Sequence, residues 1–159
     1  MDQTITIEAA TRVDDALMEA MARLVPQLSR SAPIPTLKQV KEIVESRCTE
    51  LLVARDRNGD GRILGTLTLA VFRIPTGVRA WIEDVVVDAD ARGRGVGEAL
   101  SRVALEIAAD RGARTVELTS RPSREAANRL YVRLGFVLRE TNVYRYTVPP
   151  QGEATAPAL

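Results

Sequence analysis

The segment from Arg92 to Gly97 carries residue types that can hold phosphate groups. It has the sequence Arg-Gly-Arg-Gly-Val-Gly and stands directly before the clearest amphipathic helix pattern of the chain. The first backbone N–H groups of a helix have no partner within the helix, and the helix dipole adds about half a positive charge there. Glycines let a phosphate approach these amides closely, and the two arginines add donors and positive charge. The segment therefore predicts a pyrophosphate-binding loop.

Two common phosphate-binding loops do not fit this segment. The P-loop requires Gly-Lys-Ser or Gly-Lys-Thr, and the chain contains neither. The dinucleotide fingerprint requires G-x-G-x-x-G, whereas the glycines here stand at Gly93, Gly95 and Gly97. Since a lone glycine pattern is weak evidence, a connection that binds no ligand stays open on this segment alone.

The composition excludes several classes of enzyme and partner. The 159 residues include no histidine and one cysteine, which rules out Ser-His-Asp and Cys-His catalysis and an internal disulfide framework. We also expect no metal site, and proton transfer must use Asp, Glu, Tyr, Lys, Cys or water. Lys and Arg total 22 against 21 Asp and Glu, which supports neither a nucleic-acid nor a membrane partner. Without a signal peptide or a membrane-length apolar run, we expect a cytoplasmic protein.

Hydrophobic periodicity predicts the elements that must position this loop. Caps at Thr11, Thr36 and Ser123 should open three helices, and the helix after the loop should run from Val96 to a stop at Gly112. Alternating apolar residues, short apolar runs and strand-type composition predict the strands 4–8, 51–54, 63–72, 78–87, 115–118 and 136–148.

The order of these elements is β-α-α-β-β-β-α-β-α-β, which predicts a mixed α/β (α+β) sheet covered by helices. With no repeat or linker, residues 1–148 are expected to form a single domain. Residues 149–159 are rich in Pro, Gly, Ala and Thr and predict a disordered tail.

Two separate motifs resemble those of the GNAT superfamily of N-acetyltransferases. The segment Arg92–Gly97 is similar to the Q/R-x-x-G-x-G/A loop by which that family binds the pyrophosphate of acetyl-CoA. The segment Ala127–Phe136, A-N-R-L-Y-V-R-L-G-F, looks like the second family signature, A-x-x-L-Y-x-x-L-G-F. The resemblance covers Val78 to Val148 well. It implies the family's acyl-CoA N-acyltransferase fold, with a central, mostly antiparallel twisted sheet flanked by helices.

The resemblance also implies a reaction, in which a primary amine of a small molecule or peptide attacks acetyl-CoA directly, without an acyl-enzyme. Backbone groups of the strand before the loop would pair with pantetheine, and an amide there would polarise the thioester carbonyl. Tyr131 would protonate the departing thiolate, although without the family packing on the apolar stripe of its helix is the favoured explanation. The cofactor-binding set carried over is Val85, Val86, Val87, Arg92, Gly93, Arg94, Gly95, Val96, Gly97 and Ser120.

The chain departs from the family pattern at Arg124, and Ser120 allows two explanations. Arg124 stands where many family members carry an asparagine that contacts pantetheine, so this contact is not carried over. Ser120 follows the predicted strand 115–118 and would face the acetyl group, but helix or turn capping is the alternative explanation.

Glu83 and Asp84 are adjacent acids in an otherwise apolar strand. Burial of an unpaired carboxylate is costly, so such acids often have a functional reason to be there. We assign Glu83 as the base or water-holder that deprotonates the substrate ammonium, with Asp84 as the alternative. A solvated or salt-bridged acid explains either residue as well. A local bulge, which the family has in this strand, would change the faces on which they lie.

The acceptor amine stays undecided. The strand 82–88 is similar to that of glucosamine-6-phosphate N-acetyltransferases, which keeps an amino sugar open, whereas the acid pair favours a cationic amine. Arg121 and Arg124 could bind a coenzyme phosphate or a substrate carboxylate, or form a solvated helix face. A non-catalytic acyl-CoA-binding or regulatory module on the same fold is the second hypothesis. Homodimers are common in the family, so a homodimer stays open too.

Overall fold

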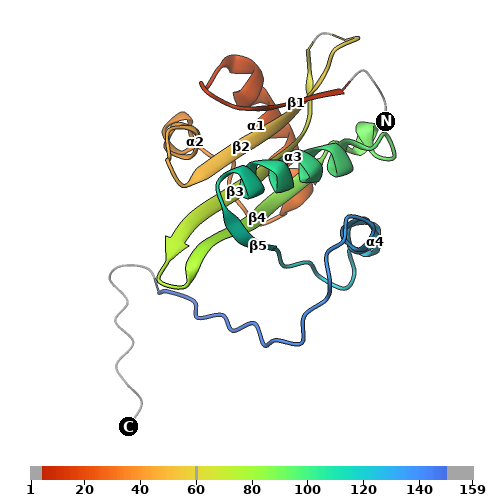
Figure 1. The fold of residues 1–159 in the computed structure, drawn as a ribbon. Helices are drawn as coiled ribbons and strands as arrows, with labels where there is room; N and C mark the ends of the chain where they lie inside the picture. The colour runs from red at the N-terminus through yellow and green to blue at the C-terminus, as the bar shows by residue number, and fades with distance from the viewer. Residues whose placement is uncertain (1–4, 60, 150–159) are drawn as a thin grey trace.

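A five-stranded sheet between helices forms the centre of the computed structural model, which describes residues 5–59 and 61–149 (Figure 1). The strands are β1 (Ile5–Ala9), β2 (Thr49–Asp56), β3 (Ile63–Ile74), β4 (Gly77–Val87) and β5 (Ala113–Glu117). The helices are α1 (Asp15–Leu28), α2 (Leu37–Val44), the short 3₁₀ helix η1 (Ala89–Ala91), α3 (Val96–Asp110) and α4 (Glu125–Arg133). The strands follow chain order across the sheet, antiparallel from β1 to β4, with β5 parallel to β4. The predicted α/β fold with a mostly antiparallel central sheet is confirmed.

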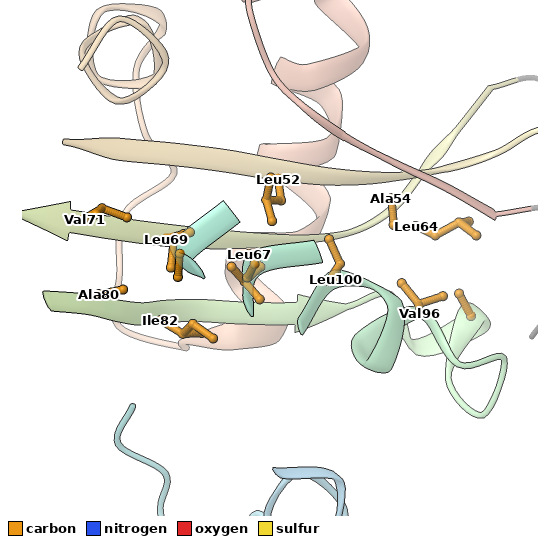
Figure 2. Packing of buried hydrophobic residues seen from close by; sticks show 13 residues of the cluster. Leu52, Ala54, Leu64, Leu67, Leu69, Val71, Ala80, Ile82, Val96 and Leu100 are labelled. Carbon is orange, nitrogen blue, oxygen red and sulfur yellow. The ribbon is translucent and has the colours of Figure 1, made fainter. Parts of the chain in front are cut away.

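Helices cover both faces of the sheet because alternate side chains of each strand point to opposite faces. α1 and α2 pack on one face, where Leu17 and Leu24 meet Val53 of β2. α3 packs on the other face, where Leu100 lies among side chains such as Leu67 (Figure 2). The sheet therefore separates two hydrophobic cores, and its two faces can serve different ligands.

α4 follows β5 and is attached more loosely than the other long helices (Figure 1). None of its residues is fully buried, whereas α3 buries five. Leu130 of α4 lies against Gly97 at the start of α3, and the Arg124 guanidinium donates a hydrogen bond to the carbonyl oxygen of Leu28 at 3.0 Å. α4 thus joins the start of α3 to the end of α1. The predicted cap at Ser123 is wrong, because a turn places Arg124 at the cap position without a side-chain cap bond.

The other two predicted helix caps have different outcomes. The cap at Thr11 is wrong, because the Asp14 carboxylate accepts a hydrogen bond from the backbone N–H of Leu17 at 2.9 Å and starts α1 there. Asp is among the best N-caps, so this aspartate has the advantage over a threonine three residues earlier. The capping box of Thr36 and Gln39 is confirmed at the start of α2.

The strand predicted over residues 136–148 is wrong. Residues 136–149 form neither helix nor strand, and Val143 and Tyr144 are 76% and 87% exposed. An alternating pattern forms a strand only where a neighbouring edge pairs its backbone and covers its apolar side chains. The segment instead reaches β5 through the Arg139 guanidinium, 3.4 Å from the Glu117 carboxylate. Most of the predicted tail, residues 150–159, lies outside the described residues.

Candidate active site

The predicted phosphate-binding loop is an uncapped helix start. Gly93 and Gly95 have positive φ angles of 79° and 80°, which glycine adopts without Cβ strain. Gly95 is the N-cap residue of α3 and offers no side chain to the first helical N–H groups. A Cβ built at either glycine meets no atom within 4 Å, so the space around the loop is open. Backbone donors and the positive end of the helix dipole therefore face space that a ligand can enter.

The strand before the loop has an open edge. β4 pairs with β5 only from Val78 to Trp81, so within residues 5–59 and 61–149 no strand pairs with the β5-side edge of residues 82–87. β5 ends at Glu117, and the chain continues toward α4. Backbone groups on such an edge can pair with an extended ligand as another strand would. The open edge leads directly into the glycine-rich loop.

A β-bulge interrupts β4 at the acid pair. Residues 66–68 of β3 oppose residues 83–86 of β4, so β4 carries one extra residue here. Asp84 has a φ of 51°, which is uncommon for a residue with a side chain. Both Glu83 and Asp84 are exposed, so the cost of a buried carboxylate does not explain either acid. The bulge lies where β4 has parted from β5, and it leaves both acids accessible beside the open edge.

Tyr131 lies half-buried on α4, in edge-to-face contact with Phe136 at a ring-centroid distance of 5.7 Å. Burial raises the pKa of Tyr131 from its usual 10.0, and the nearby charge of Arg124 offsets only part of this rise in pKa. The hydroxyl therefore stays protonated at neutral pH. The preceding residue, Leu130, packs against Gly97, so α4 meets the start of α3 one residue before this tyrosine.

Ser120 lies on the connection between β5 and α4. Its hydroxyl is buried and has no hydrogen-bond partner within the described part of the chain. Capping, the alternative explanation for this serine, is therefore wrong. An unsatisfied buried hydroxyl costs about 1–3 kcal/mol, so a polar ligand atom or a water is expected to pair with it.

The two arginines of the loop have different surroundings. The Arg94 guanidinium donates to the Asp56 carboxylate at 3.0 Å and so ties the loop to the turn between β2 and β3. Arg92 is exposed on the loop surface. No group of His, Cys, Asp and Glu side chains in the described ranges is arranged to hold a metal ion.

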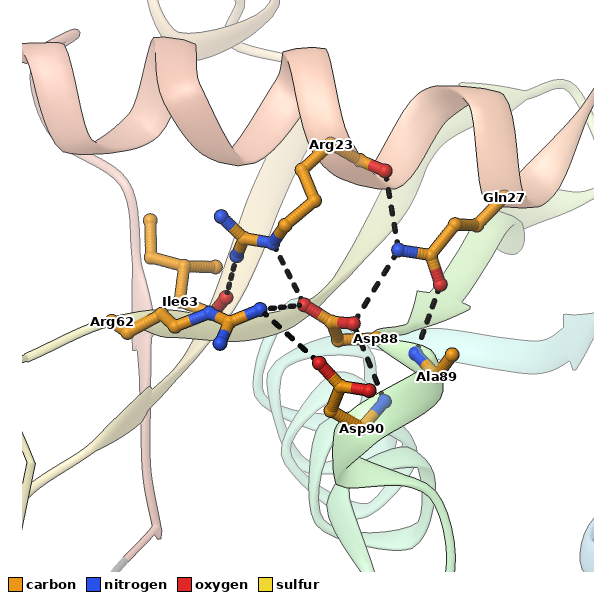
Figure 3. A network of polar contacts seen from close by, with 7 residues as sticks. All are labelled: Arg23, Gln27, Arg62, Ile63, Asp88, Ala89 and Asp90. Carbon is orange, nitrogen blue, oxygen red and sulfur yellow. Dashed lines mark hydrogen bonds and ion pairs between the residues drawn. The ribbon is translucent and has the colours of Figure 1, made fainter.

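Asp88, which the sequence did not single out, anchors the chain between β4 and the loop to α1 (Figure 3). Its side chain is 3% exposed, and its carboxylate accepts hydrogen bonds from Arg23 Nε and Arg62 Nη2, both at 2.7 Å. Gln27 donates to the same carboxylate at 3.4 Å and accepts from the backbone N–H of Ala89 at 2.9 Å. The partners Arg62 and Arg23 are 26 and 65 residues away in sequence, so no local pattern could reveal this network.

We expect Asp88→Asn to lower the free energy of unfolding by about 2 kcal/mol at pH 7. Burial raises the pKa of Asp88, but the hydrogen bonds, above all from Arg23, outweigh it and hold the pKa at about 2. Because this pKa lies below that of the unfolded chain, the stabilisation is present above about pH 4 and is lost as the pH falls toward 2. Urea denaturation from pH 7 to pH 2.5 should show the difference between the two proteins shrinking in acid.

The matched control is Asp90→Asn. The Asp90 side chain is 83% exposed and lies 3.9 Å from Arg62, so its loss should change stability by less than about 0.5 kcal/mol. Equal stability of Asp88→Asn and the wild type at pH 7 would contradict the role given to the Asp88 carboxylate.

Comparison with known proteins assigns the family. The family model of the Acetyltransferase (GNAT) family matches residues 17–136, more than half of the 159-residue chain. The chain belongs to the GNAT family. This GNAT protein is 46% identical over 61 residues to an uncharacterized N-acetyltransferase from Methanocaldococcus jannaschii. That match spans 38% of the GNAT chain and 27% of the relative's length.

Solved structures share the whole GNAT fold. A transcriptional regulator from Bacillus halodurans C-125 is 27% identical with a TM-score of 0.74, covering 90% of this chain and 99% of that one. An aminoglycoside acetyltransferase from an uncultured soil metagenomic sample, in complex with trehalose, is 20% identical with a TM-score of 0.80. It covers 93% of this chain and 98% of its own, and at this identity the likeness shows the fold alone. The GNAT family assignment supports acyltransferase chemistry. No helix of the described residues could cross a membrane.

Proposed function

We propose that this GNAT protein is an N-acetyltransferase that moves the acetyl group of acetyl-CoA to a primary amine of a small molecule or peptide. The observation that carries the proposal is the uncapped start of α3, with its two left-handed glycines, at the end of the open edge of β4. A diphosphate fits the helix start, and an extended pantetheine arm fits the strand edge.

Residues of the loop and the edge would hold the coenzyme. Backbone groups of β4 near Val85 and Val87 would pair with pantetheine, and the amides from Gly93 to Gly97 would bind the pyrophosphate. The unsatisfied hydroxyl of Ser120 has the chemistry to pair with a polar atom of the same ligand. Acetyl-CoA supplies an activated thioester. The full proposed binding set is Val85, Val86, Val87, Arg92, Gly93, Arg94, Gly95, Val96, Gly97 and Ser120.

Two proton transfers then fall to this chain. The amine must lose a proton before its lone pair can attack the carbonyl carbon, and Glu83, directly or through a water, accepts that proton. The C–N bond forms as the C–S bond breaks, the nitrogen releases its second proton to solvent to become the amide, and the sulfur leaves as a thiolate that needs a proton. The Tyr131 hydroxyl donates it, since burial keeps this group protonated. A backbone N–H of β4 near the bulge stabilises the carbonyl oxygen as negative charge develops on it.

Glu83→Gln should lower kcat/KM by about 100-fold at pH 7, because a positioned base contributes roughly 10²–10⁴-fold. The loss should shrink as the pH approaches the pKa of the acceptor amine, since more of the amine is then already neutral. The comparison variant is Asp84→Asn, which removes the neighbouring exposed acid from the same bulge. A pH–rate profile of both variants checks the assignment. A larger loss in Asp84→Asn with the same pH response would exchange the two roles.

The direct test mixes the purified protein with acetyl-CoA and a panel of amines and measures thiol release. Calorimetry with acetyl-CoA provides the independent binding measurement. Absence of both coenzyme binding and thiol release would overturn the proposal. Tight binding of acetyl-CoA without acetylation of any amine would instead favour a non-catalytic acyl-CoA-binding module.

A further inference from the structure

A polar hollow of about 440 Å³ lies between the C-terminal end of α1 and the chain that follows β5. The side chains around it include two guanidinium groups and no carboxylate. Its polar lining residues are Gln27, Ser29, Arg30, Ser31 and Arg121. Such a lining favours a ligand that carries negative charge.

The hollow adjoins the two chain segments that follow β4 and β5. Gln27 accepts a hydrogen bond from the backbone N–H of Ala89, two residues after β4, and Arg121 comes four residues after the end of β5. β4 and β5 are parallel, so their C-terminal ends lie at the same side of the sheet. Ligands of open α/β sheets bind outside the C-terminal ends of parallel strands. The hollow is therefore placed where a second substrate can meet the coenzyme.

The hollow and the glycine-rich loop adjoin different helices. α1, which forms one wall of the hollow, packs on one face of the sheet, whereas α3, which the loop opens, packs on the other. The coenzyme phosphates are assigned to the α3 side, so the arginines on the α1 side are suited to a different ligand.

The two lining arginines have their charge available for such a ligand. Neither Arg30 nor Arg121 makes an ion pair with any residue in the described part of the chain. The third arginine at this place, Arg124, is bound to the carbonyl oxygen of Leu28 and so offsets the negative end of α1. The Ser29 and Ser31 hydroxyls, 3.5 Å apart and hydrogen-bonded to each other, lie at the same rim.

We propose that the acceptor is an amine that also carries an oxyanion, either carboxylate or phosphate, and that Arg30 and Arg121 bind this group. The inference rests on the proposed acetyl transfer and names the substrate class for it. Guanidinium groups bind carboxylate and phosphate through paired N–H donors, which fixes the orientation as well as the charge of the ligand. The acceptor's amine is then directed toward the gap between β4 and β5.

Paired acceptors test the proposed charge requirement. Amino acids are compared with their amides, and amino sugar phosphates with the free amino sugars, in the thiol-release measurement. We expect kcat/KM for the best anionic member to exceed that of its neutral partner by about 100-fold or more, as for two charge-assisted contacts. Equal rates within such pairs would overturn the inference and leave the acetyltransferase proposal intact.

Variants test the two arginines. Arg30→Gln with Arg121→Gln should raise KM for the anionic acceptor by about 100-fold, leave the Kd of acetyl-CoA unchanged, and abolish the preference within each pair. Arg73→Gln is the control, because Arg73 is exposed and pairs with Val78 at the opposite end of β4. Since Arg30 and Arg121 are exposed, the melting temperature of the double variant should match that of the wild type.

The oxyanion could also come from the coenzyme. If the double variant weakens acetyl-CoA but not acetyl-3′-dephospho-CoA, the arginines bind the coenzyme phosphate and the inference is wrong. A direct binding measurement tests the inference separately from the proposed function. In calorimetry, the wild type should bind an amino sugar phosphate but not the free amino sugar. The double variant should not bind the amino sugar phosphate. Equal binding in all three titrations would overturn the inference even if acetyl transfer were never observed.

Discussion

Gly95→Asp should weaken acetyl-CoA binding by about 100-fold or more, equivalent to roughly 2.7 kcal/mol. Gly95 is the N-cap residue of α3, so an aspartate carboxylate there would lie next to the backbone N–H groups assigned to the pyrophosphate. It would both occupy these donors as a helix cap and repel the diphosphate. Calorimetric titration with acetyl-CoA measures the loss directly, and the thiol-release rate should fall with it at subsaturating coenzyme.

The matched control is Gly112→Asp at the other end of the same helix. Gly112 has a φ of 74°, close to the 80° of Gly95, and a Cβ at either position meets no atom within 4 Å. Both variants therefore carry a similar backbone strain of about 1 kcal/mol and the same new charge. Only Gly95→Asp should lose coenzyme binding. An unchanged Kd in Gly95→Asp would show that the diphosphate binds elsewhere.

Tyr131→Phe should lower kcat by about 100-fold while the Kd of acetyl-CoA changes less than threefold. The change deletes only the hydroxyl, and the ring keeps its edge-to-face contact with Phe136. Without the proton donor the sulfur must leave as a free thiolate. Because burial raises the pKa of Tyr131, its hydroxyl should stay protonated in the wild-type protein up to about pH 9. Steady-state kinetics beside coenzyme calorimetry separates catalysis from binding.

Tyr144→Phe is the control for this change, because Tyr144 is 87% exposed in the segment after α4. It should retain wild-type kcat. If Tyr131→Phe also keeps the wild-type rate, the tyrosine serves only in packing, and a water must protonate the thiolate.

The parts of the fold that were predictable depend on local patterns. The glycine-rich loop and α3 could be predicted because all the residues that specify them lie within one short strand–loop–helix segment. The predicted start of α3 at Val96 is confirmed. The capping box at Thr36 is equally local and is confirmed as well. Helix periodicity and N-terminal signals act within a few residues, which is why one sequence is enough to see them.

The features that were missed depend on distant partners. Residues 136–148 have the alternating pattern of a strand, but a strand also needs a neighbouring strand edge to pair with. The sequence of the segment does not show whether such an edge is available. The network of Asp88 joins residues from α1 and from the turn before β3, which only the folded chain brings together. The argument that burial of Glu83 and Asp84 would be costly likewise does not apply, because both acids are exposed at the bulge.

The loose attachment of α4 has a consequence for how the molecule opens. A helix without a fully buried residue can detach at a fraction of the energy that melts the sheet, so its amide protons should exchange with solvent far sooner than those of α3. The residue assigned to protonate the thiolate lies on this helix. On warming, the proposed acetyl transfer should therefore be lost at a lower temperature than the one at which the rest of the protein unfolds. A bound coenzyme in contact with both α3 and α4 would reduce the difference between these two temperatures.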